Sequence, residues 1–499
     1  MTVIVHTGVV VGVTGQPVAV EAKLRPGIPY FDLVGLAGSA IREARTRVEQ
    51  AVRSSGLSWP RKRITLNLAP AELRKEGSGL DLALAIACLA EERSLCTERL
   101  SQTTYLGELS LDGALRPVRG VLPVVEEALR RGQRFAVVPT ANAAEAALVP
   151  GLTVVPADDL RQALAFAEEG QRRKAWPAAS EAQTSSAPDW SELRGQNNAK
   201  RAAIIAIAGG HNLLLSGPPG TGKTMLARCL PGLLPPLEGD ELLEVLRVRS
   251  VVEGGAAAGR RCRPFRAPHH TISTAGMVGG GRPLAPGEVT VAHGGVLFLD
   301  ELAEFPRLAL ESLRQPLEDG EITVTRAGAR VTFPARVMLV AATNPCPCGF
   351  LGAESRGCAC TPSAVHRYQA RLSGPIMDRI DLSVAMDRPP ARELLEAAPR
   401  GETSEQLRQR IGEARARARR RQGCLNAELS RDIVRRVQAE PATVAMLTQA
   451  SDRLGLSPRL TTRMLRVARS IADIEQSDQV TTTHLAEAFS MRLPSAEAA

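Results

Sequence analysis

Short apolar runs and helical spacings alternate along the first third of the chain. Runs at residues 9–13 and 64–68 predict β-strands, and apolar positions within residues 41–52 and 80–89 recur at helical spacing. Strands that alternate with helices predict a separate α/β domain over residues 1–170.

The apolar pattern stops at residues 171–190, which are rich in Ala, Ser and Pro, as is typical of a mobile linker. A second α/β block follows over residues 191–388. Pro389 and Pro390 then interrupt regular structure.

Residues 391–499 indicate a helical domain. An Arg-rich helix is expected from Ser404, residues 460–474 are apolar at helical spacing, and residues 482–489 predict a short helix with a threonine cap.

Composition narrows the class of protein. We expect a cytoplasmic location without membrane contact, because no apolar run approaches the roughly 18 residues of a membrane span and the N-terminus lacks a secretory signal. The net charge of +9 favours an anionic partner such as nucleic acid, and a surface charged for solubility is the alternative. With only 3% aromatic residues, contacts to the nucleic-acid backbone are favoured over base stacking.

A strand, a glycine-rich loop and a helix are predicted in succession at residues 213–230. The glycines let backbone N–H groups face phosphates, and the helix N-terminus adds positive potential. We expect Lys223 to reach the β- and γ-phosphates of ATP and the Thr224 hydroxyl to bind Mg²⁺. The loop has the pattern G-x-x-x-x-G-K-T and consists of Gly217, Pro218, Pro219, Gly220, Thr221, Gly222, Lys223 and Thr224.

Two further apolar strands end in polar residues that suit such a site. Residues 295–299 lead into Asp300 and Glu301, and residues 337–340 lead towards Asn344. Open α/β sheets bind ligands at the carboxyl ends of their strands, so Asp300 is expected to hold Mg²⁺ and Glu301 to polarise the attacking water. This ordered set resembles the AAA+ ATPases, with Asn344 as sensor 1, and implies an AAA+ P-loop core with a C-terminal helical lid.

Two segments resemble the arginine positions of AAA+ proteins. Residues 373–381 look like the stretch bearing the arginine finger, which favours Arg379. The helix start at Ser457 resembles the sensor 2 position and favours Arg459, with Arg463 as the alternate. An arginine lent by a neighbouring subunit stabilises the transferred phosphoryl group, so the resemblance implies a ring, a homo-hexamer.

The long connection at residues 264–281 resembles the helix-2 insert of the magnesium-chelatase branch. Its adjacent His269 and His270 lack metal-ligand spacing, and we interpret them as structural or DNA-facing. Residues 317–333 alternate around an Ala-Gly-Ala turn and predict a β-hairpin, with Arg326 and Arg330 near the tip as DNA contacts.

These segments, together with residues 195–213 and 344–349, resemble the ComM/YifB group of magnesium-chelatase-like ATPases over nearly the whole chain. The resemblance implies a hexameric, ATP-dependent DNA translocase or branch-migration helicase that acts on branched or single-stranded DNA in recombination or natural transformation. The alternative is a chelatase-type subunit that remodels a protein partner for metal insertion.

Four of the nine cysteines crowd into fifteen residues, at Cys346, Cys348, Cys358 and Cys360. Four soft ligands predict a closed, structural Zn²⁺ site, and unligated thiols are the alternative.

Residues 70–83 and 107–113 resemble the Lon-type protease fold, an α/β domain of the ribosomal S5 type. Lon proteolysis requires a serine activated by a lysine. The matching lead-in puts Gly79 at the nucleophile position beside Ser78, and residues 120–124 contain no lysine. We therefore expect a proteolytically inactive domain with a scaffold or DNA-binding role.

Overall fold

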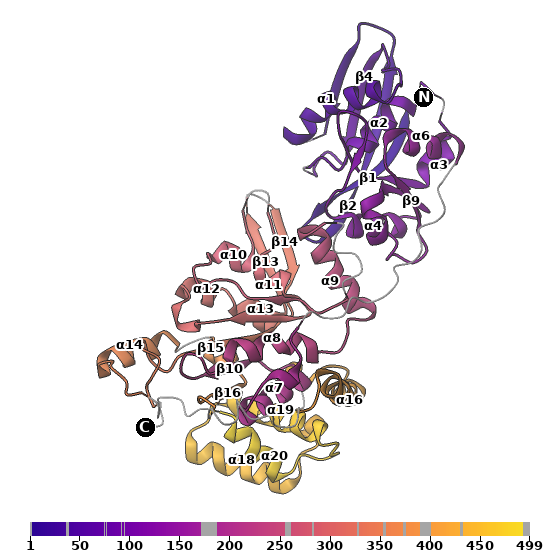
Figure 1. Ribbon diagram of the computed structural model, residues 1–499. Coiled ribbons are helices and arrows are strands. Elements are labelled where there is room, and N and C mark those ends of the chain that lie inside the picture. Colours follow the sequence, from indigo (N-terminus) through magenta and orange to yellow (C-terminus); the bar gives the residue numbers. More distant parts are fainter. Residues whose placement is uncertain are drawn as a thin grey trace. The chain divides into compact units, whose positions relative to one another are not determined.

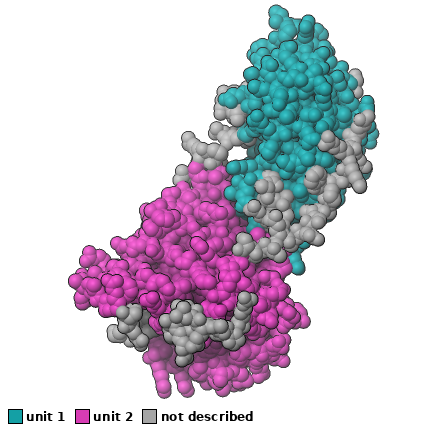
Figure 2. Space-filling model, viewed as in Figure 1, with its two compact units in different colours: residues 1–183, 238–261 teal, residues 184–237, 262–499 magenta. Residues whose placement is uncertain are grey.

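The computed structural model describes most of the chain: residues 2–35, 39–73, 75, 77–90, 92–93, 95–170, 187–254, 261–281, 284–326, 329–352, 356–372, 376–389, 401–429 and 433–492. The chain divides into two compact units (Figure 2). Unit 1 comprises residues 1–183 and 238–261, and unit 2 comprises residues 184–237 and 262–499. Among the described residues, no helix has both the length and the apolar character needed to cross a membrane.

Unit 1 is built on a seven-stranded mixed sheet of order β3-β4-β2-β1-β5-β8-β9 (Figure 1). The predicted strand at residues 9–13 runs instead over β1 (Val3–Val11), because Gly12, at φ 67°, begins the turn into β2. The predicted strand at 64–68 and both predicted helices are confirmed. The other strands are β2 (Thr14–Arg25), β3 (Tyr30–Val34), β4 (Arg63–Ala69), β5 (Thr103–Tyr105), β8 (Phe135–Pro139) and β9 (Thr153–Ala157), beside the short pair β6 (Glu108–Leu109) and β7 (Leu115–Arg116). The helices are α1 (Ser39–Ser54), α2 (Asp81–Ala90), α3 (Thr97–Ser101), α4 (Val121–Arg130), α5 (Ala143–Ala146) and α6 (Leu160–Glu169).

A helix from the middle of the chain also belongs to unit 1. This helix, α9 (Gly239–Val252), packs against α4, and its Leu246 is 2% exposed in the core that α4 helps to form. Arg247 donates to both carboxylate oxygens of Glu126, at 2.5 and 3.0 Å. The Leu122 N–H donates to Ser250 Oγ at 3.3 Å. The sequence-based division placed α9 in the 191–388 block, whereas its apolar face completes the core of unit 1.

Unit 2 is centred on a five-stranded parallel sheet of order β11-β12-β15-β10-β16. Its predicted strands at residues 213–215, 295–299 and 337–340 are confirmed. Because every neighbouring pair is parallel, the carboxyl ends of the strands lie along one edge. The strands are β10 (Leu213–Ser216), β11 (Phe265–Arg266), β12 (Val296–Leu299), β15 (Met338–Thr343) and β16 (Leu382–Ala385).

Several helices pack around this sheet and in the C-terminal part of unit 2. They are α7 (Asn197–Gly209), α8 (Lys223–Leu233), α10 (Thr274–Val278), α11 (Glu288–Val291), α12 (Arg307–Glu311), α13 (Arg314–Asp319), α14 (Pro362–Leu372), α16 (Ser404–Gln422), α17 (Ile433–Val437), α18 (Pro441–Leu454), α19 (Pro458–Ile474) and α20 (Thr482–Ser490). The three C-terminal helices expected from the sequence are therefore confirmed.

Two arginines of the Arg-rich helix α16 pack within unit 2. Arg415 is buried, and Arg421 forms a bidentate pair with the buried Asp473 of α19, at 2.7 and 2.9 Å. Of the predicted linker, residues 171–186 lie outside the described residues. Trp190 is 4% exposed in the core of unit 2, so the end of that segment is part of the folded unit.

We expect Leu246→Ala to destabilise unit 1 by about 2–5 kcal/mol, the cost of truncating a buried leucine. Hydrogen exchange of the full chain should show faster exchange in α4, while α8 of unit 2 keeps its protection. Leu111→Ala is the matched control, because Leu111 is 58% exposed in the same unit. Unchanged protection in α4 would contradict the placement of α9.

Candidate functional site

The glycine-rich loop leaves the end of β10 and enters α8. A Cβ atom at Gly217 would lie 2.1 Å from the carbonyl oxygen of Met386, so a larger residue does not fit there. The Lys223 side chain lies against the loop, and its Nζ donates to the carbonyl oxygens of Gly217 (2.5 Å) and Pro218 (2.9 Å). It also donates to Asn344 Oδ1 at 3.2 Å, which joins the loop to the strand beside it.

The acidic pair follows β12 at the same edge of the sheet. Thr224 Oγ1 donates to Asp300 Oδ2 at 2.8 Å, and the Glu301 N–H donates to Asp300 Oδ1 at 3.0 Å. Burial lowers the pKa of Lys223, and the charges of Asp300 and Glu301 oppose that shift. Glu301 adopts φ 54°, a conformation that costs a non-glycine residue on the order of 1–3 kcal/mol and recurs at functional sites.

His270 lies next to the acidic pair. Its Nδ1 is 3.5 Å from Glu301 Oε2, its ring packs against His269 with centroids 4.1 Å apart, and its edge meets Phe305. Sequence reasoning interpreted the two histidines as structural or DNA-facing. Nothing in the sequence pattern indicated the contact with Glu301, because about 30 residues separate the two positions.

A cavity of about 270 Å³ opens beside residues 220–222 of the loop. Concave sites of this kind, with a few polar groups, suit a small ligand, and the position beside the loop suits the base of a nucleotide. Gln196 Nε2 donates to the carbonyl oxygen of Thr221 at 3.1 Å and thereby ties the cavity wall to the loop. Gln196 lies in the segment of residues 195–213 that carries the family resemblance, but the sequence pattern did not predict that it borders the site. The other polar side chains of the lining belong to Glu192, Arg194, Lys200 and Arg388.

The two candidate arginines meet at one carboxylate. Arg379, with 6% of its side chain exposed, donates through Nη2 to Glu318 Oε2. Arg459, 47% exposed, lies with Nη2 3.8 Å from Glu318 Oε1. The pKa of Glu318 is lowered, first by Arg379 and also by Arg459. The contacts of Lys223 described above include neither arginine.

Arg463, the alternate for sensor 2, is buried in a structural role. Its Nε lies 2.9 Å from Asp381 Oδ1, and its Nη1 donates to the carbonyl oxygen of Ile380 at 2.9 Å. A further contact joins its Nη2 to the carbonyl oxygen of Asp378. Arg463 therefore anchors α19 to the residues on both sides of Arg379.

The predicted hairpin is confirmed as β13 (Glu321–Arg326) and β14 (Ala329–Pro334), paired antiparallel. Arg330 is exposed near the tip. Residues 327–328 and the side chain of Arg326 lie outside the described residues.

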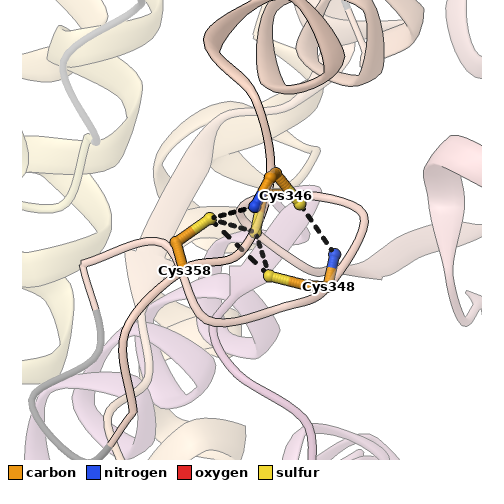
Figure 3. A group of neighbouring side chains, drawn as sticks. Cys346, Cys348 and Cys358 are labelled. Carbon is orange, nitrogen blue, oxygen red and sulfur yellow. Dashed lines mark hydrogen bonds between the residues drawn. The ribbon is translucent and has the colours of Figure 1, made fainter.

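The four clustered cysteines come together in the loop after β15. Figure 3 shows the side chains of Cys346, Cys348 and Cys358 pointing towards one another; their sulfur atoms are 3.4 to 3.6 Å apart. With Cys360 included, all four sulfur atoms lie within 4.8 Å of one another. Sulfur atoms bound at about 2.3 Å to a tetrahedral zinc ion are roughly 3.8 Å apart, so the cluster fits such an ion.

The thiols of the cluster shift one another's titration. Backbone hydrogen bonds from Phe350 and Ala359 lower the pKa of Cys348 to about 6, whereas burial and the neighbouring thiols raise the pKa of Cys358 and of Cys360. The thiolate is the form that binds metal.

Three family models match the chain. "Magnesium chelatase, subunit ChlI" covers residues 189–394, "Subunit ChlI of Mg-chelatase" covers residues 20–142, and "Magnesium chelatase, subunit ChlI C-terminal" covers residues 401–492. Together they span both compact units.

Among curated proteins, the chain is 44% identical to the uncharacterized protein YifB of Escherichia coli, over 98% of this chain and 96% of that protein. It is 43% identical to the competence protein ComM of Haemophilus influenzae, over 98% of this chain and 97% of that protein. The DNA replication licensing factor Mcm2 of Drosophila melanogaster is a more distant relative, 25% identical over 38% of this chain and 20% of that protein.

We expect Arg463→Ala and Arg459→Ala to differ sharply in stability. Removing Arg463 leaves the largely buried Asp381 without its arginine partner, which costs about 3–5 kcal/mol, whereas removing the half-exposed Arg459 should change stability by less than about 0.5 kcal/mol. Urea unfolding of the full chain, together with exchange protection of α19, measures both. Equal stability of the two variants would contradict the structural role of Arg463.

Proposed function

The chain belongs to the ComM/YifB group of magnesium-chelatase-like AAA+ proteins, and from this premise we propose that it is an ATP-driven motor that moves branched DNA. The observation that carries the proposal is the network joining Lys223 to Asn344 and Thr224 to Asp300, with Glu301 beside it. Two relatives support it by name, the competence protein ComM and the DNA replication licensing factor Mcm2.

The residues of this network divide the work of phosphoryl transfer. Lys223 and the loop N–H groups bind the phosphates, while Thr224 and Asp300 would hold the Mg²⁺ that neutralises charge on them. Glu301 orients and polarises the attacking water, and Asn344 fixes the γ-phosphate from the neighbouring strand. His270 holds the Glu301 carboxylate in place.

A homo-hexameric ring completes the site. In this proposal Arg379 and Arg459 of one subunit stabilise the γ-phosphate bound by its neighbour. Within one chain, Glu318 keeps both guanidinium groups together and offsets part of their charge. When a nucleotide is bound to the neighbouring subunit, its γ-phosphate competes with Glu318 for the two guanidinium groups.

DNA contact is assigned to the hairpin β13–β14, through Arg326 and Arg330. The exposure of Arg330 and the net charge of +9 support a salt-sensitive grip on the DNA backbone. The match to magnesium chelatase favours a second candidate: a subunit that uses the same ATPase site to remodel a protein partner for metal insertion. DNA should stimulate ATP hydrolysis by a DNA motor, whereas a partner protein should stimulate it in a chelatase-type subunit.

Unit 1 is proposed as a Lon-like domain without proteolytic activity. Gly79 stands at the expected nucleophile position. Ser78 Oγ donates to Glu108, and the ammonium group of Lys75 donates to the carbonyl oxygen of Pro70. These contacts give neither group the serine–lysine pairing that Lon hydrolysis requires.

We further assign the cysteine cluster to a structural Zn²⁺ ion. Four thiolates close the coordination sphere and leave no open position for a substrate, so the metal would stabilise the loop after β15.

ATP hydrolysis is expected to rise severalfold when forked or four-way-junction DNA is added, and to fall as salt is increased. Lys223→Ala should lose nucleotide binding. Glu301→Gln should bind nucleotide yet turn over about 10²–10⁴-fold more slowly, the range for loss of a general base. Steady-state ATPase and junction-unwinding assays measure these effects.

Leu308→Ala is the control for these variants, because Leu308 is 71% exposed in unit 2 and belongs to none of the site contacts described above. It should keep the wild-type rate of ATP hydrolysis and its response to DNA. Wild-type protein whose ATPase responds to a partner protein and never to DNA would favour the chelatase-type function and exclude the motor.

Elemental analysis of the purified full chain should give about one zinc per chain, as expected for a four-thiolate site. Cys358→Ser should lose the metal, whereas Cys424→Ser, at a cysteine outside the cluster, should retain it. Reduced wild-type protein with well under one zinc per chain would exclude the site.

A further inference from the structure

The loop after β15 that carries the four cysteines, here called the cysteine loop, directly contacts the glycine-rich loop of residues 217–224, here called the nucleotide loop. Gly349, at φ 85°, packs against Pro219: a Cβ atom placed there would lie 2.6 Å from Pro219 Cδ and 2.9 Å from Cγ. The same position is 3.8 Å from Cγ of Asn344. One glycine thus lies against both the phosphate loop and the amide that binds Lys223.

The cysteine cluster holds this glycine in place. The Gly349 N–H donates to the carbonyl oxygen of Cys346 at 2.9 Å, which closes a turn around Cys348. Cys346 is fully buried, and it follows Asn344 by two residues. Metal binding at the cluster would therefore fix the segment from Asn344 to Gly349.

The second pair of cysteines, Cys358 and Cys360, is also connected to the phosphate site. Cys358 and Cys360 lead into α14, whose Gln369 Nε2 donates to the carbonyl oxygen of Pro345 at 3.4 Å. Arg371 of α14 lies 3.4 Å from Glu304, three residues after Glu301. Both ends of the cysteine segment are therefore tied to strands or turns that contribute to the phosphate site.

We propose that the cysteine cluster is a positioning element for the nucleotide loop: the metal-bound cluster presses Gly349 against Pro219 and holds the loop in its phosphate-binding form. The proposal rests on the zinc site proposed above. The loop must present several N–H groups to one ligand, and any freedom at Pro219 lowers the fraction of protein ready to bind. Loss of the metal would therefore weaken nucleotide affinity, although no cysteine touches the phosphates.

Two glycines of the cysteine loop give a matched test. Gly349 and Gly352 both have positive φ, at 85° and 75°, so alanine strains the backbone similarly at either position. Of these two glycines, only Gly349 would bring the added Cβ into a collision with residues that the structure describes, since no described atom lies within 4 Å of a Cβ placed at Gly352. With a fluorescent ATP analogue and the full chain, we expect Gly349→Ala to retain its zinc and bind at least about tenfold more weakly, and Gly352→Ala to stay within about twofold of wild type.

A second variant separates this collision from general misfolding. Pro219→Ala removes the Cγ and Cδ atoms that the new Cβ would meet, so Gly349→Ala combined with Pro219→Ala should bind better than additivity of the single changes predicts. Additive losses, or equal affinities of Gly349→Ala and Gly352→Ala, would overturn the contact.

Metal removal tests the other half of the proposal. Zinc-stripped wild-type protein should bind the analogue more weakly and recover when zinc is returned; equal affinity with and without the metal would overturn the proposal. Because the readout is nucleotide binding alone, failure of the DNA-motor function, seen as absent DNA stimulation, would leave this result unaffected.

Discussion

The register of β10 against β15 sets the geometry on which the phosphate site depends. Ser216 pairs with Thr343, and the Gly217 N–H donates to the Thr343 carbonyl oxygen at 3.2 Å, so the loop and Asn344 leave the sheet side by side. Lys223 Nζ then lies 3.2 Å from Asn344 Oδ1. Because β12 pairs with the other side of β15, Asp300 arrives at the same edge, where Thr224 meets it. The hydrogen-bonded pairing of these three strands therefore brings the residues of the phosphate site together.

The surrounding charges are organised by burial. Arg459 and Arg463 lie four residues apart at the start of α19, yet one is half exposed and the other is enclosed. Arg463 is bound to Asp381 and two carbonyl groups, which removes it from any exchange with a ligand. Arg459 and Arg379 share the exposed Glu318, an interaction that solvent weakens and an anionic ligand can replace. The same helix thus provides one fixed and one available guanidinium group.

The division into units follows packing more than chain order. The chain passes between the units at residues 183–184, 237–238 and 261–262, because α9 is built into unit 1. Leu246 and the pair of Arg247 with Glu126 make that helix part of the core beside α4. The chain therefore passes from α8, the helix that follows the phosphate loop, to α9 of unit 1 through the short segment of residues 234–238.

The parts of the site that are contiguous along the chain could be predicted from the sequence: the loop from Gly217 to Thr224, the acidic end of β12, the strand before Asn344 and the four cysteines. Local patterns suffice there because strand, turn and helix are set by the spacing of neighbouring residues. The folded structure was needed to show that His270 meets Glu301, that Gln196 borders the cavity, that Gly349 packs on Pro219 and that α9 joins unit 1. Those contacts join elements far apart in sequence, and spacing along one element does not say which other element its faces will meet.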